Sequence, residues 1–110
     1  MAVSDQASWT PVMALDEVEA GNPVPVVLGP RVVALCRVAD TVYAIDDTCS
    51  HMEASLSEGT LQGTVITCPR HGGQFDIRTG EAVRMPAVDP IDTFPVRIED
   101  GRIWVNTEKV

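Results

Sequence analysis

The chain has 110 residues, 45% of them hydrophobic, so we expect one domain, residues 1–110, with a continuous core. Eight basic residues against sixteen acidic ones give a formal net charge of −8, which argues against nucleic acid binding because phosphate recognition needs clustered Lys and Arg. No apolar run approaches the roughly 20 residues that span a bilayer, and residues 1–10 lack a basic start and an apolar signal segment, so we expect a cytoplasmic protein without membrane contact.

Short β-rich runs separated by turn residues predict an all-β sandwich or barrel. Residues 14–20, which end before Gly21 and Pro23, are the one segment that could form a short helix. The turn Asp100-Gly101 predicts that the runs on either side of it pair as a hairpin. The predicted strands, in chain order, are residues 24–28, 31–38, 41–45, 65–67, 74–77, 94–98 and 102–105.

Three cysteines form an odd set, and without a secretory signal a disulfide framework is not expected. Within the predicted strand 31–38, alternation places Cys36 on the same face as Val32, Ala34 and Val38. Cys36 is therefore interpreted as a buried core residue without a functional role.

The other two cysteines stand beside the only two histidines, in the segments Cys49-Ser50-His51 and Cys68-Pro69-Arg70-His71, which sixteen residues separate. Pro, Gly and Asp residues around both segments break regular structure and predict two ligand loops. Residues 56–66 have the turn glycines and alternating apolar residues to run out and back, which would bring the loops side by side. The pattern predicts a four-ligand metal site.

Two sulfurs and two nitrogens also suit tetrahedral zinc, so a zinc-stabilised binding module is one alternative. The familiar zinc arrangement pairs Cys with Cys and then His with His, whereas here each segment supplies one of each. A Rieske centre requires that mixed supply, because one iron keeps two thiolates and the other takes two imidazoles. Ligand order favours one [2Fe–2S] cluster.

At these residues the sequence resembles the Rieske family, whose signature segments are C-x-H and C-x-x-H. Residues 55–59 and 68–81 are similar to bacterial ferredoxins that serve aromatic-ring dioxygenases of the biphenyl, carbazole and naphthalene kind, and the resemblance covers residues 9–106. It implies a Rieske-type β-sandwich with a small cluster-binding subdomain, about residues 46–86. It further implies that Cys49 and Cys68 bind one iron and that His51 and His71 bind the other.

The resemblance implies a one-electron carrier without catalytic residues. Its partners would be an NADH-dependent ferredoxin reductase containing FAD and the terminal oxygenase. The alternative is a Rieske-like small subunit of an assimilatory nitrite reductase, a group that generally lacks the complete ligand set. Ala54 and Arg70 stand where respiratory members of the family have an extra cysteine in each loop, which implies no inter-loop disulfide and a low reduction potential. Met85-Pro86-Ala87 is either a third loop over the cluster or an ordinary turn.

The negative charge is concentrated in residues 1–60, where nine acids against two bases leave −7. Four of these acids flank the first ligand loop: Asp46, Asp47, Glu53 and Glu58. This predicts docking on a basic partner surface, and an acidic surface that only maintains solubility is the alternative.

Overall fold

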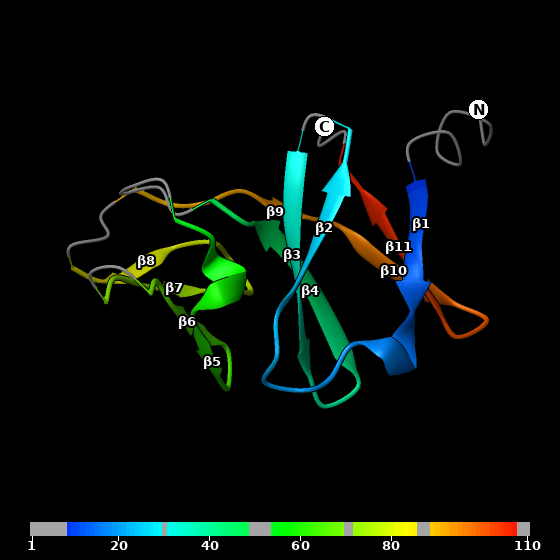
Figure 1. Ribbon diagram of the computed structural model, residues 1–110, viewed down its shortest axis with the longest axis horizontal. Coiled ribbons are helices and arrows are strands. Elements are labelled where there is room, and N and C mark those ends of the chain that lie inside the picture. Colours follow the sequence, from blue (N-terminus) through cyan, green and yellow to red (C-terminus); the bar gives the residue numbers. More distant parts are fainter. Residues whose placement is uncertain (1–8, 30, 49–53, 70–71, 86–88, 108–110) are drawn as a thin grey trace.

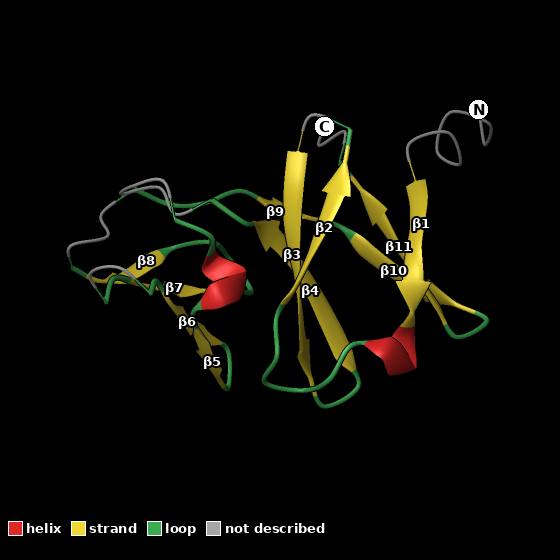
Figure 2. Cartoon of the chain, viewed as in Figure 1, coloured by secondary structure: helices red, strands yellow, loops and turns green. Residues whose placement is uncertain are grey.

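The structure, a computed structural model, describes residues 9–29, 31–48, 54–69, 72–85 and 89–107. In these ranges the elements are short antiparallel strands and two single-turn 3₁₀ helices, so the predicted all-β fold is confirmed (Figure 2). In chain order they are β1 (Trp9–Ala14), η1 (Leu15–Glu17), β2 (Val24–Leu28), β3 (Arg31–Val38), β4 (Thr41–Asp46), η2 (Leu56–Glu58), β5 (Thr60–Gln62), β6 (Val65–Thr67), β7 (Gln74–Asp76), β8 (Ala82–Arg84), β9 (Thr93–Phe94), β10 (Val96–Glu99) and β11 (Arg102–Asn106).

The strands form three sheets, with the orders β1-β11-β10, β2-β3-β4-β9 and β5-β6-β7-β8. The first two stand next to each other in Figure 1, and we call them together the base. The third, the small sheet, lies beside the base at one end of the molecule. It is made by consecutive hairpins within residues 60–84. Strands β5 and β6 lie between the two predicted ligand segments in the sequence, and β7 and β8 follow the second one.

Strand β3 lies between two hydrophobic cores, because its side chains are buried on both faces. Ala34 and Cys36 belong to the core that the base shares with the small sheet, whereas Val33 and Leu35 belong to the core inside the base. The prediction that Cys36 is a core residue is confirmed, since none of its surface is exposed. Val32, predicted on the same face, is 38% exposed, so the buried part of that face does not extend to the start of the strand.

The helix predicted over residues 14–20 is wrong in extent, because only the single turn η1 forms. After it, Val18 has extended backbone angles and its side chain is fully buried in the base. The Arg37 guanidinium donates hydrogen bonds of 3.1 Å to the carbonyl oxygens of Leu15 and Val18. A side chain from β3 therefore satisfies the carbonyls that a longer helix would have bonded internally.

The run predicted as one strand over residues 94–98 is divided at Pro95 into β9 and β10, which join different sheets of the base. Pro has no backbone N–H to continue a ladder, which explains the break. Sequence analysis missed β1, β5 and β8, which are edge strands of their sheets. The hairpin at Asp100-Gly101 is confirmed, with φ values of 55° and 73° between the paired strands β10 and β11.

Candidate metal centre

The second ligand segment begins at the end of β6, where Cys68 is 3% exposed. Its backbone N–H donates to the Gly73 carbonyl at 2.7 Å, and the Gly72 N–H donates to the Cys68 carbonyl at 3.2 Å. Gly72 has a φ of +79°, a backbone conformation that residues with a side chain rarely adopt. These bonds close the stem of the loop, so the backbone of Cys68 is fixed against Gly72 and Gly73 at the other end of the segment.

The first ligand segment leaves the base just after β4. Thr48 forms an isolated antiparallel bridge with Ser55, and its N–H donates to Asp46 Oδ1 at 2.9 Å. The Leu56 N–H donates to the Asp47 carbonyl at 2.6 Å. The chain thus departs and returns at one point, where residues 46–48 lie against residues 55–57.

The predicted out-and-back course of residues 56–66 is confirmed by η2 and the paired strands β5 and β6. Gly59 is the point of closest approach, because a Cβ atom added there would lie 1.9 Å from the Thr67 carbonyl oxygen. Thr67 immediately precedes Cys68, and Gly59 closes η2 after the first loop returns. The end of the first ligand segment is therefore packed on the strand that leads into the second.

Of the four predicted ligands, Cys68 is placed by the structure, whereas Cys49, His51 and His71 lie outside the described residues. Within the part of the chain that is described, no group of three or more metal-ligating side chains occurs. Of the segment Met85-Pro86-Ala87, Met85 is described and is 76% exposed at the end of β8, so the role of that segment stays a prediction.

Cys36 differs from Cys68 in its surroundings, although both belong to the core shared by the base and the small sheet. Burial, together with the negative charge of Asp47, raises the pKa of the Cys36 thiol to about 12. Cys36 is therefore protonated at neutral pH, whereas the thiolate is the form that binds metal. The buried position agrees with the sequence prediction that Cys36 is a core residue.

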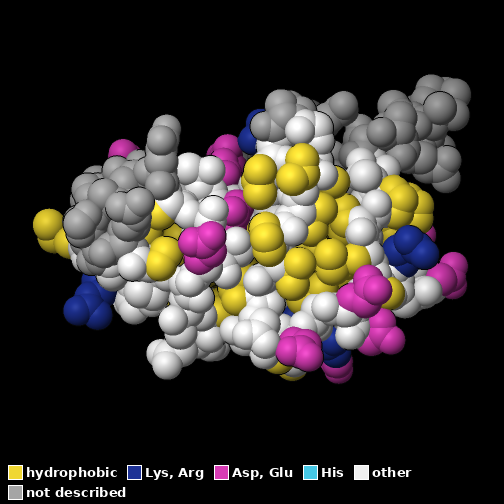
Figure 3. All heavy atoms as spheres, viewed as in Figure 1, with side chains coloured by type: hydrophobic (Ala, Val, Ile, Leu, Met, Phe, Trp, Pro, Cys, Tyr) yellow, Lys and Arg dark blue, Asp and Glu magenta, His cyan; other side chains and the backbone are white. Residues whose placement is uncertain are grey.

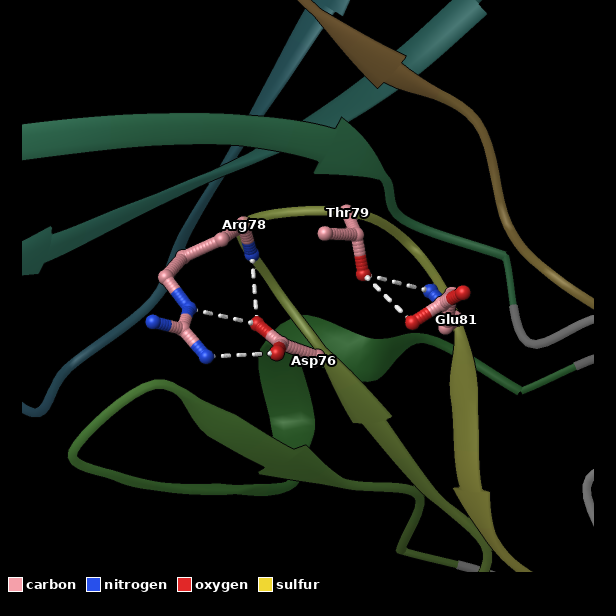
Figure 4. A network of polar contacts seen from close by, with 4 residues as sticks. All are labelled: Asp76, Arg78, Thr79 and Glu81. Carbon is pink, nitrogen blue, oxygen red and sulfur yellow. Dashed lines mark hydrogen bonds and ion pairs between the residues drawn. The ribbon is translucent and has the colours of Figure 1, made fainter.

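The turn after β7 contains a polar network of four residues whose contacts the sequence alone does not indicate (Figure 4). Asp76 Oδ1 accepts hydrogen bonds from the Arg78 backbone N–H and Nε, and Oδ2 accepts one from Nη2. These bonds hold the pKa of Asp76 below its usual value. The Thr79 hydroxyl accepts a bond from the Glu81 N–H at 3.2 Å. The network fixes the turn between β7 and β8.

That turn also connects the small sheet to the base. The Ile91 N–H donates to the Gly80 carbonyl at 2.8 Å, and a Cβ atom on Gly80 would lie 2.1 Å from the Ile91 carbonyl oxygen. Ile91 is buried and precedes β9, a strand of the base. Glycine at this position permits the two backbone segments to come into contact, which accounts for Gly80 in this turn.

The residues present fit an iron–sulfur cluster. A buried cysteine held by backbone hydrogen bonds is a suitable thiolate ligand, whereas the buried Cys36 thiol stays protonated. Both loop stems are closed, and each loop has one cysteine and one histidine in its sequence. This donor set is the one that a Rieske centre needs.

Comparison with known proteins agrees with this fit. The model of the Rieske [2Fe-2S] domain family matches residues 8–95. The chain is 39% identical to the anthranilate 1,2-dioxygenase ferredoxin subunit of Burkholderia cepacia, covering 96% of this chain and 98% of that protein. It is 42% identical to ferredoxin CarAc of Metapseudomonas resinovorans, over 92% and 95% of the two chains. A solved complex of reduced oxygenase and oxidized ferredoxin in carbazole 1,9a-dioxygenase contains a chain that superimposes with a TM-score of 0.88 at 41% identity, covering 94% of this chain and 96% of that one.

The matches cover nearly the whole length of these ferredoxins, and they extend through both predicted ligand segments. The chain therefore belongs to the Rieske [2Fe–2S] domain family, as a ferredoxin that carries electrons with one Rieske-type cluster.

Proposed function

We propose that this ferredoxin transfers single electrons from an NADH-dependent reductase containing FAD to the terminal oxygenase of an aromatic-ring dioxygenase system. The observation that carries the proposal is the near full-length similarity to ferredoxin components of such systems. The similar solved chain in complex with an oxygenase supports an oxygenase as the electron acceptor. The reductase is proposed because a carrier of this kind needs an electron donor.

We propose that Cys49 and Cys68 hold one iron and that His51 and His71 hold the other. Support comes from the buried position of Cys68 and from the closed stems of both loops. When bound, the cluster supplies a one-electron redox centre, with a potential between about −150 and +300 mV in this class of protein. The chain's own part is to fix the ligands, to shield Cys68 from solvent and to keep Cys36 out of the ligand set.

The residues available are sufficient for an electron carrier but not for an oxygenase. Oxygen activation at a mononuclear iron requires two further histidines and a carboxylate, and the sequence has two histidines in all, both assigned to the cluster. It also lacks a G-x-G-x-x-G motif for a nicotinamide or flavin nucleotide.

The proposed place of action is the cytoplasm, where NADH is available to the reductase. No helix in the described ranges is long and apolar enough to cross a membrane.

The test is to purify the protein in air, measure iron and acid-labile sulfide, and assay it with a reductase, NADH and an oxygenase. We expect about two irons and two sulfides per chain, red-brown colour and a Rieske EPR signal after dithionite reduction. Cys49→Ser, Cys68→Ser, His51→Ala and His71→Ala should each lose or degrade the cluster, and Cys36→Ser is the matched control that should retain it. Stoichiometric zinc without visible absorption would support the binding module instead, and electron delivery only to a nitrite reductase would support the other alternative.

A further inference from the structure

Asp47 is the only charged residue that is buried among those the structure describes, with 4% of its surface exposed. Burial of a carboxylate costs several kcal/mol unless hydrogen bonds compensate for the lost hydration. None of the ion pairs found in the described ranges includes Asp47. Hydrogen bonds must therefore account for its position.

Three hydrogen bonds connect Asp47 to elements on both sides of the first ligand loop. Its N–H donates to the Val32 carbonyl on β3 at 3.0 Å, and its own carbonyl accepts the Leu56 N–H at 2.6 Å. Its Oδ1 atom accepts the Ser57 N–H at 2.8 Å. Asp47 thus joins the base to η2, across a chain separation of ten residues.

The carboxylate replaces a cap that η2 lacks. The N-cap residue of η2, Ser55, makes no side-chain capping hydrogen bond, and the first N–H groups of a helical turn have no partner within the turn. Asp47 satisfies two of them, one with its carbonyl and one with its carboxylate. Beside these bonds Thr48 pairs with Ser55, so the loop stem consists of residues 46–48 against residues 55–57.

Between the two sides of this stem the sequence contains Cys49 and His51, one proposed ligand for each iron. We propose that Asp47 is a positioning residue, whose carboxylate oxygen fixes the stem of the first ligand loop and thereby the placement of Cys49 and His51 toward the cluster. The inference depends on the proposed ligand set, and it assigns to Asp47 a role in cluster geometry beyond a contribution to folding.

The test separates the place of the acceptor oxygen from the charge of the side chain. Asp47→Asn keeps an oxygen where Oδ1 lies and removes the charge, whereas Asp47→Glu keeps the charge and displaces the oxygen by one methylene. We expect the reduced Asn variant to keep the wild-type EPR g values, and the Glu variant to show shifted or broadened g values. Loss of the visible spectrum in the presence of a chelator should be about tenfold or more faster for Asp47→Glu, the effect of losing one buried hydrogen bond to a charged group.

Asp76→Glu is the matched control, because Asp76 Oδ1 also accepts a backbone N–H, from Arg78 at 2.9 Å, in a turn away from the ligand segments. It should leave the g values unchanged. Wild-type g values in Asp47→Glu, or equal spectral changes in the Asn and Glu variants, would overturn the proposal. If the Glu variant fails to fold, an altered EPR spectrum of Asp47→Asn alone is sufficient to overturn it. Wild-type protein measured in parallel separates this result from failure of the proposed function, which would remove the Rieske signal from every sample.

Discussion

Replacement of Gly59 by alanine should disturb the second ligand segment through a single steric contact. Gly59 has a φ of −87°, which alanine adopts without strain, so the backbone conformation itself is not the obstacle. The added Cβ atom would lie 1.9 Å from the Thr67 carbonyl oxygen and 3.2 Å from that of Leu56. Both are backbone atoms, which cannot rotate away as the end of a side chain can, so the strand before Cys68 must move.

Overpacking costs about 1–3 kcal/mol, and a clash between backbone segments belongs at the upper end of that range. In a domain of this size about 3 kcal/mol lowers Tm by about 12 °C or more. We therefore expect the apoprotein of Gly59→Ala to unfold at a Tm lower by this amount. The purified variant should also contain less iron than the wild-type protein.

Gly63→Ala provides the control within the same hairpin. Gly63 has a φ of +60° and no atom within 4 Å of an added Cβ, so alanine there costs about 1–2 kcal/mol of backbone strain without moving Thr67. That variant should lose some stability and keep its iron. Wild-type Tm and iron content in Gly59→Ala would refute the reasoning, because the contact would then be relieved at no cost.

Three further predictions concern the turn between β3 and β4, the third cysteine and the docking charge. Ala39 has a φ of 56°, so Ala39→Gly should raise the free energy of unfolding by about 1 kcal/mol, measured by urea denaturation. Cys36→Ala should lower it by about 1–2 kcal/mol through the cavity it leaves, with iron content and EPR spectrum unchanged; loss of iron would make Cys36 a ligand. Electron transfer to the oxygenase should slow as salt rises, and Glu58→Gln should reduce this dependence whereas Asp16→Asn should not; a stopped-flow rate constant independent of salt would contradict it.

The sequence predicted the strands best where the local pattern and the tertiary environment agree. Strands β2, β3 and β6 have the predicted bounds, since they are rich in β-branched residues and end at turns. The division at Pro95 and the arrest of the helix at Val18 depend on distant partners: the two sheets of the base in one case, and the Arg37 guanidinium in the other. Such contacts leave no periodic signal in a single segment.

The sequence leads to a proposed ligand set for the candidate site, but it does not indicate the residues that support the ligand loops. Cysteine and histidine are rare enough in this chain for their adjacency to be informative, and the core position of Cys36 followed from alternation. The supporting residues are common types whose roles arise from contacts between segments. In the sequence Gly59 looks like an ordinary turn glycine, and only the structure shows that Thr67 lies against it. Asp47 likewise looks like a surface acid, and only the structure shows that it is buried.

Burial of Asp47 also changes the interpretation of the acidic charge in residues 1–60. Asp47 cannot face a partner, and the exposed Asp16, Glu17, Glu19 and Asp40 lie around η1 and the β3–β4 turn, which are on the lower edge of the base in Figure 1, outside the small sheet; acidic side chains are seen on that edge in Figure 3.

Among the described acids that flank the first ligand loop, Glu58 is thus the exposed one, because Asp46 is half-buried and accepts the Thr48 N–H. On the small sheet, Val83 in β8 and Met85 just after it are 51% and 76% exposed. Strand β8 pairs with β7, which begins directly after Gly73, the residue that closes the second ligand loop. A partner that receives electrons at this end therefore meets these apolar side chains together with the exposed Glu58. We expect apolar contact to hold the complex and the charge of Glu58 to act on its rate of formation, because electrostatic steering changes the association rate more than the affinity.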